Sequence, residues 1–292
     1  ATLYPGGFTP RFIGKVDQSY GTVGIKGTAE SGMTYDLSGT LGRHSTDLSM
    51  TNSLSASFGP ASQTSFEFGK LIQSEITANL DLTYPLEAGF ASPITLSGGA
   101  EYRREQYKAT VGDPQSFNAG PFAAQALFTE TAPGSGLYTR TGTANQNPGA
   151  SGYGGTSPQA AGTFSQSNYS VYVGAETDIT EALSAGVAGR YENYNTFGGV
   201  FVGKFNFLYR VSDTFSLRGT VGTGFHAPSP GQSNVQILTT NFVSGGQVQT
   251  GTYPVGSAVA QFFNAKALVP ERSTNFGLGF ILKPTTGLTF TV

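Results

Sequence analysis

The side chains that most often do chemistry in proteins are scarce in this chain of 292 residues. It contains no cysteine, which excludes a thiol nucleophile, an iron–sulfur cluster, a disulfide framework and a cysteine-ligated zinc. Its two histidines, His44 and His226, are far apart in the sequence, and neither has carboxylates spaced for a metal site. No Gly-x-Ser-x-Gly elbow is present, and Gly222-Thr223-Gly224 lacks the third glycine of a dinucleotide-binding loop. These residue types predict neither an enzyme nor a cofactor site.

Charged residues make up 12% of the chain, against about 25% in typical soluble domains. The formal net charge is −2, so no basic surface is expected that would hold nucleic acid. One short segment gathers four charges, on Glu101, Arg103, Arg104 and Glu105. They could form a catalytic carboxylate pair, but a salt-bridged strand end is the favoured interpretation.

Alternating apolar and polar residues predict β-strands along most of the chain. Every second residue from Ile76 to Tyr84 is apolar, and the residues between them, such as Asn79 and Asp81, are polar. A shift of one residue would invert this pattern, so the register of such a strand is well specified. The same alternation recurs at 94–103, 169–176, 183–192, 201–210, 215–222 and 275–283, more loosely at 21–29 and 34–43, and begins again at 288.

About ten strands result, and the connections between them alternate in length. Short turns at one rim and long loops at the other are typical of an up-and-down membrane barrel. We therefore expect the two longest connections to lie at one end of the sheet and to contain little helix. The short connections are 30–33, 86–92, 179–182, 212–213 and 284–287, and the long ones are 45–69, 111–165 and 224–271, with a short exception near 196–199.

A soluble β-sandwich would also alternate, with its apolar residues inside and its polar residues outside. Three features favour a membrane barrel instead: apolar faces that often end in tyrosine, polar faces rich in glycine and serine, and the segregation of the long loops. The sequence contains no run of about 18 apolar residues, so no transmembrane helix is predicted. The predicted fold class is therefore all-β, an antiparallel up-and-down transmembrane β-barrel.

Five motifs resemble those of TonB-dependent outer-membrane receptors, in the order in which that family carries them. The segment 217–229, LRGTVGTGFHAPS, resembles the family's LRGSYSTGFRAPS, although His226 stands where the signature usually has arginine. The segment 268–280, LVPERSTNFGLGF, resembles LKPEKSTNYELGF. The other motifs are SLSASFGP followed by TSF within 53–66, EYRRE at 101–105 and GRYENY at 189–194.

The resemblance implies a bacterial outer-membrane location, contact with outer-membrane lipid, import of a small solute and coupling to a TonB protein through a plug domain. The family's plug domain and the C-terminal strands of its barrel are not in this sequence. Residues 1–292 are therefore interpreted as a partial barrel domain, about ten strands of a barrel of about 22. We expect no cofactor, no enzymatic activity and no nucleic-acid partner.

Two sets of side chains are candidates for contact with a solute. Loop aromatics could stack on sugars or aryl chelates, or could simply pack the loops onto one another. Charged residues on the predicted lumen face could pair between strands, or could form a polar path for the solute or a seat for the plug. The loop candidates are Phe122, Phe128, Tyr138, Tyr153, Phe242 and Tyr253, and the lumen candidates are Glu176, Arg190, Lys204, Arg210 and Arg218.

Three functions are compatible with the sequence. The favoured one is the barrel segment of an outer-membrane receptor for energy-coupled uptake of a metal chelate, cobalamin or an oligosaccharide. The alternative is a small self-contained passive channel or structural barrel of about ten to twelve strands. An outer-membrane hydrolase is the third hypothesis, and it lacks a visible nucleophile and base.

Overall fold

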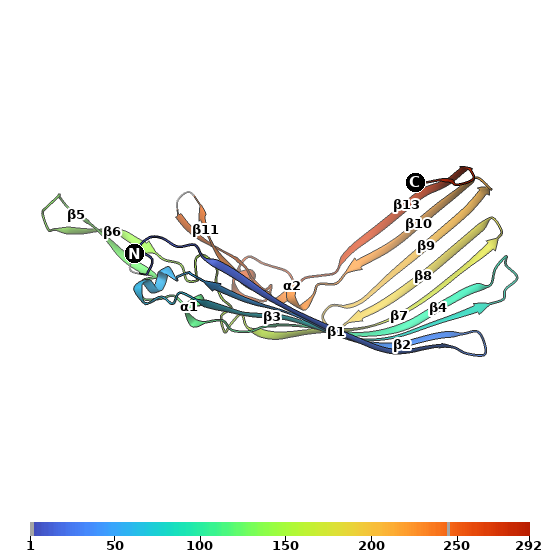
Figure 1. Ribbon diagram of the computed structural model, residues 1–292, viewed down its shortest axis with the longest axis horizontal. Coiled ribbons are helices and arrows are strands. Elements are labelled where there is room, and N and C mark those ends of the chain that lie inside the picture. The colour runs from blue at the N-terminus through green and yellow to red at the C-terminus, as the bar shows by residue number, and fades with distance from the viewer. Residues whose placement is uncertain (1–2, 244–245) are drawn as a thin grey trace.

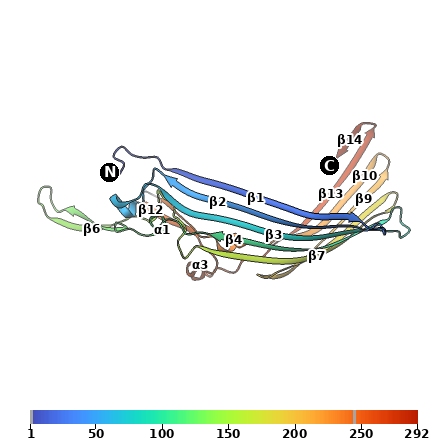
Figure 2. The same cartoon turned by 60° about the horizontal axis from the view of Figure 1, so that its bottom comes forward.

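The computed structural model describes residues 3–243 and 246–292. Ten strands form one antiparallel sheet that curves into an open trough (Figures 1 and 2). The all-β, up-and-down architecture predicted from the sequence is therefore confirmed. In pairing order the strands are β1 (Arg11–Thr28), β2 (Thr34–Thr51), β3 (Phe66–Leu86), β4 (Ile94–Ala109), β7 (Gly162–Thr180), β8 (Leu183–Tyr194), β9 (Gly198–Ser212), β10 (Phe215–His226), β13 (Glu271–Thr285) and β14 (Leu288–Thr291).

The sheet is open in the part of the chain that the structure describes. Strand β1 pairs there with β2 alone, and β14 pairs with β13 alone. Val292 continues the β13–β14 ladder, because its N–H donates to the Phe280 carbonyl at 3.0 Å and its carbonyl accepts from the Phe280 N–H at 3.1 Å. A small self-contained barrel would need its first and last strands to pair with each other, and among the described residues they do not.

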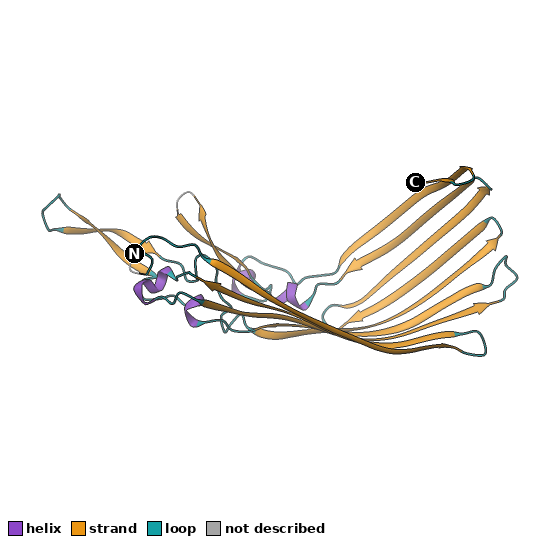
Figure 3. Ribbon diagram, in the orientation of Figure 1, coloured by secondary structure: helices purple, strands orange, loops and turns teal. Residues whose placement is uncertain are grey.

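Turns and loops lie at opposite ends of the strands, which we call the turn end and the loop end (Figure 3). Both of the longest connections leave at the loop end, as the alternation of connection lengths predicts. Their helices are short, as expected, but each connection also carries a two-stranded hairpin that the alternation pattern does not predict. Residues 110–161 hold α1 (Pro114–Phe117), β5 (Ala124–Glu130) and β6 (Tyr138–Asn145), and residues 227–270 hold α2 (Pro230–Asn234), β11 (Ile237–Val243), β12 (Gly246–Thr252) and α3 (Ala258–Phe262).

Apolar side chains are exposed on one side of the sheet, and polar side chains are buried on the other. On β7, Tyr169, Val171 and Val173 are 58%, 53% and 66% exposed, whereas Asn168 and Ser170 are 4% and 1% exposed. This is the reverse of a soluble sandwich, and it matches a barrel that has lipid outside and a polar interior. We call the two sides the apolar face and the polar face.

The sheet extends further toward the loop end than the sequence pattern predicts. Residues 45–51 and 66–69, expected to form part of a connection, instead continue β2 and β3. The β2–β3 register shifts between Leu48 and Ser49, and Gly69 adopts there a positive φ of 96° that favours glycine. This bulge interrupts the alternation on which the sequence prediction depends.

At the loop end the polar face carries an aromatic cluster. The ring of Tyr153, from the 110–161 connection, lies 4.7 Å from that of Phe68 and 4.8 Å from that of Phe12, both edge-on. Tyr153 also forms an isolated β-bridge with Thr239 of β11, so the two long connections pack together over the sheet. None of the described helices is long and apolar enough to cross a membrane. The buried core residues of the cluster are Met50, Phe66, Phe68 and Ala150.

Candidate functional site

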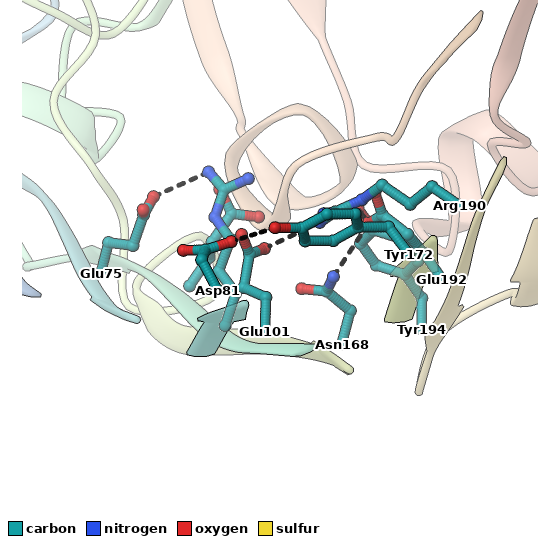
Figure 4. Close-up of polar contacts among 10 residues, drawn as sticks. Glu75, Asp81, Glu101, Asn168, Tyr172, Arg190, Glu192 and Tyr194 are labelled. Carbon is teal, nitrogen blue, oxygen red and sulfur yellow. Dashed lines mark hydrogen bonds and ion pairs between the residues drawn. The ribbon is translucent and has the colours of Figure 1, made fainter. Parts of the chain in front are cut away.

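Charged and hydrogen-bonding side chains gather on the polar face of β3, β4, β7 and β8 (Figure 4). The antiparallel register brings them together, because residues directly opposite each other in a pair of strands point to the same face. Arg103 of β4, for example, lies opposite Thr77 of β3 and Asn168 of β7. We call this group the polar network, and its members are Glu75, Asp81, Glu101, Arg103, Glu105, Asn168, Tyr172, Arg190, Glu192 and Tyr194.

Arg103 joins β3 to β4. Its Nη2 donates to Glu75 Oε2 and to Glu105 Oε1, both at 2.7 Å. Its Nε is buried and has no hydrogen-bond partner among the described residues. The guanidinium therefore bonds to two carboxylates through one nitrogen, and its Nε donor is unused among the described residues.

Arg190 joins strands that are not neighbours. Its Nε donates to Glu192 Oε1 on β8 at 2.6 Å, and its Nη2 reaches across β7 to Glu101 Oε1 on β4 at 3.2 Å. On the intervening strand β7, Ser170 is opposite Glu101 and Glu192, and Tyr172 is opposite Arg190. The Arg190 bridge therefore joins β8 to β4 across β7 with charge-assisted bonds.

Glu192 is the most heavily bonded carboxylate of the network. Besides Arg190, the Asn168 amide donates to it at 3.0 Å and the Tyr194 hydroxyl donates at 2.9 Å. Glu192 is 8% exposed, so these donors replace the water that its burial removes. A separate bond reaches across β4, where the Tyr172 hydroxyl donates to Asp81.

Negative charge is in excess in the polar network. Glu75, Glu101, Glu105, Glu192 and Asp81 carry five carboxylates, against the two guanidiniums of Arg103 and Arg190. Within the described residues no group of three or more histidine, aspartate or glutamate side chains is arranged to hold a metal ion. The side chains of the polar network interact through ion pairs and hydrogen bonds.

The five predicted lumen residues all lie on the sheet, but the structure does not gather them at one point. Arg190 belongs to the polar network, whereas Glu176, Lys204 and Arg218 line a separate groove nearer the turn end. Arg210 serves the β7–β8 turn, because its Nη1 donates to the Glu181 carbonyl at 2.6 Å. The prediction that they face a lumen stays a prediction.

The loop aromatics do not converge on one site either. Phe128 and Tyr138 lie on the β5–β6 hairpin and are 60% and 65% exposed, while Tyr153 packs in the aromatic cluster. Phe122 packs against Gly59, at which an added Cβ would meet the phenyl ring at 2.7 Å. Tyr253 is half-buried beyond the end of β12, and the side chain of Phe242 lies outside the described residues.

The sequence predicted ion pairing for only some members of the polar network. It placed Glu101, Arg103, Arg104 and Glu105 in a salt-bridged strand end. Glu101, Arg103 and Glu105 do form ion pairs, but in the middle of β4 rather than at its end, and Arg104 lies on the apolar face opposite Ile76. Alternation alone assigns Glu75 and Asp81 to the polar side of β3. The partnership of Glu192 with Asn168 had no sequence signal, because it depends on the register of two strands.

Comparison with known proteins gives the family. The family model described as TonB dependent receptor-like, beta-barrel matches residues 3–292. No curated protein sequence matches the chain significantly.

Solved structures share the fold at low sequence identity. The siderophore receptor PirA from Acinetobacter baumannii is 14% identical, with a TM-score of 0.57 over 92% of this chain and 33% of that one. A mutant of the ferric enterobactin receptor PfeA from Pseudomonas aeruginosa is 16% identical, with a TM-score of 0.57 over 94% of this chain and 33% of that one. The RagAB peptide transporter is 11% identical, with a TM-score of 0.53 over 94% and 28%. The chain thus spans about a third of the length of these relatives.

Proposed function

The chain belongs to the TonB-dependent receptor-like β-barrel family, and we propose that it forms part of the wall of a receptor that imports a scarce solute. This family lies in the bacterial outer membrane, and its members are receptors and transporters rather than enzymes. The relatives of known structure include receptors for siderophores and a peptide transporter. The solutes proposed for this chain are a metal chelate, cobalamin or an oligosaccharide, and a peptide joins them from the comparison with RagAB.

The observation that carries the proposal is the inverted polarity of the sheet. Val173 is 66% exposed and Leu278 is 82% exposed on the apolar face, while the ion-paired Glu192 is buried on the polar face. A sheet of this kind is stable where lipid covers its outside and polar groups fill its inside. We infer that the polar face lines the interior of the receptor.

Closure of the barrel is part of the proposal. Each unpaired backbone group in lipid costs several kcal/mol, so a spanning sheet needs partners along β1 and β14. We propose that further strands of the receptor pair with these two edges and that a plug domain fills the interior. The plug would provide the contact with a TonB protein, and the polar network would form part of its seat.

Uptake measured in cells separates this proposal from a passive channel. The full-length receptor is expressed in an outer-membrane transport mutant, and the accumulation of labelled ferric chelates, cobalamin, oligosaccharides and peptides is followed. Energy-coupled uptake should stop when TonB is deleted or when the proton gradient is dissipated. Accumulation that persists under both treatments would favour the passive channel, and the absence of accumulation of every solute would contradict import.

A further inference from the structure

The polar face carries a groove of about 600 Å³ that is distinct from the polar network. It lies over β9, β10 and β13, with Glu176 of β7 at its margin. Lys204, Asn206, Arg218 and Thr220 provide its polar lining. Its volume falls within the range of about 300–1,000 Å³ that is typical of small-molecule sites.

Glycines make the groove hollow. A Cβ added at Gly277 would approach the Thr220 methyl to 2.9 Å, and one added at Gly279 would approach the Val292 carbonyl oxygen to 2.1 Å and Arg218 Nε to 2.9 Å. These distances are shorter than ordinary van der Waals contacts. The glycines of β13 therefore leave space for the Thr220 and Arg218 side chains and for the Val292 backbone.

The groove has positive charge that the described residues do not neutralise. Lys204 and Arg218 form no ion pair within residues 3–243 and 246–292, in contrast to Arg103 and Arg190. The one side-chain hydrogen bond of Arg218 in this part of the chain is weak, from Nη2 to the Val292 carbonyl at 3.4 Å.

The strands that carry Lys204 and Arg218 do not supply the missing negative charge. The polar face of β9 and β10 holds no carboxylate, since the positions that alternate with Lys204 and Arg218 are neutral or basic. Glu176 is the one carboxylate that lines the groove. Two cations against one carboxylate leave a local positive potential, whereas the polar network is negative.

We propose that this groove binds an anionic group, a carboxylate or a phosphate. A guanidinium and an ammonium would pair with its charge, while the Asn206 amide and the Thr220 hydroxyl could donate to its remaining oxygens. The anion could belong to a solute that crosses the barrel or to an acidic segment of the receptor's own polypeptide inside it. The inference rests on the proposed function only in placing the polar face in the barrel interior.

The first arm of the test measures binding of pyrophosphate and citrate to the purified full-length receptor in detergent by titration calorimetry. If the groove is free for solutes, both probes should bind. Lys204→Gln and Arg218→Gln should each weaken binding about tenfold, which is the usual effect of losing one charge-assisted hydrogen bond. Arg210→Gln is the matched control, because that arginine lies on the same face but bonds to the turn.

The second arm detects an internal occupant. Carbodiimide coupling joins an amine directly to a carboxylate that touches it, and mass spectrometry then identifies the joined peptides. In a Glu176→Gln background, an acidic segment in the groove should couple to Lys204, and the product should disappear in Lys204→Arg. That variant keeps the charge, so it should still bind anions in the first arm. Persistent binding would show that the variant is folded.

Anion binding that depends on Lys204 and Arg218, or a specific cross-link at Lys204, supports the groove. Absence of both overturns it, and anion binding that neither substitution weakens counts as absence of the first. Neither readout measures uptake. A receptor that binds anions in this groove but imports nothing would therefore refute the proposed function and leave the groove in place.

Discussion

Glu192 shows how a carboxylate is made stable inside this sheet. It accepts bonds from Arg190, Asn168 and Tyr194, and these three donors come from β7 and β8. A buried donor that loses its acceptor costs more than a typical hydrogen bond contributes, because it was removed from water on folding. Loss of the Glu192 side chain would therefore remove three hydrogen bonds at once.

Replacing Glu192 by glutamine should destabilise the folded receptor by about 1–3 kcal/mol, because the charge that pairs with Arg190 is lost and one acceptor becomes a donor. Urea unfolding of the full-length protein in detergent, followed by its mobility on gels without heating, measures this change. The control is Glu176→Gln, which changes a carboxylate that forms no ion pair in the described part of the chain and should alter stability by about 0.5 kcal/mol or less. Equal effects would show that the ion pairs contribute little.

Tyr153 gives the aromatic cluster a pH dependence. Burial raises the pKa of its phenol above the ordinary value of 10.0. The folded state therefore holds this proton more tightly than the unfolded state. Its contribution to stability is complete below about pH 10 and is lost as the pH rises through the folded pKa.

This shift is visible by difference titration. The absorbance of tyrosinate at high pH is recorded for the full-length receptor and for Tyr153→Phe. The phenol that is missing in the variant should titrate above the ordinary value for tyrosine. A midpoint at or below about 10 would mean that the ring is solvated and that the two long connections do not pack over it.

At the scale of elements, what the sequence predicted follows from period-two alternation. The strand from Ile76 to Tyr84 lies within β3 because its apolar residues can all face one side. The N-terminal part of β3 was not predicted, because the bulge at Gly69 and the buried Phe66 and Phe68 break that alternation.

The candidate site was less predictable than the strands. The ion pair between Glu101 and Arg190 joins residues 89 positions apart, and it exists only because β4, β7 and β8 pair in one particular register. Local sequence carries no signal for such a pair, whereas the polar side of each strand could be assigned. The groove at Lys204 and Arg218 likewise depends on glycines of β13, a strand that is distant in the sequence.

The bulge itself can be tested with Gly69→Ala. A side chain is strained at a φ of 96°, and its Cβ would lie 2.1 Å from the Thr110 carbonyl oxygen, so backbone must move. We expect a loss of about 1–3 kcal/mol and faster proteolysis within residues 110–161. Gly14→Ala is the control, since it lies in the same row of the sheet and its Cβ would have an ordinary contact of 3.8 Å with Leu48. Equal cleavage of both variants would contradict a structural role for the bulge.

For the whole molecule, the two faces of the sheet require different surroundings. The apolar face exposes large side chains, including Phe205 of β9 at 44% and Phe276 of β13 at 81%, and their exposure to water would be unfavourable. The polar face buries carboxylates that lipid could not solvate. A bilayer outside and a polar interior satisfy both faces at once, which a soluble sandwich would not.

A pair of substitutions in one strand tests this orientation. Leu217 lies on the apolar face of β10, opposite Tyr209 and Phe280, whereas Thr220 lies on the polar face opposite Asn206. An arginine that faces lipid near the bilayer midplane costs about 2–4 kcal/mol in membrane barrels, and one inside a polar lumen costs little. Leu217→Arg should therefore reduce the yield of full-length receptor that refolds into lipid vesicles, and Thr220→Arg should refold nearly as well as the unmodified protein. If Thr220→Arg were the more damaging change, the apolar face would point inward, and the barrel orientation inferred from β7 and β10 would have to be reversed.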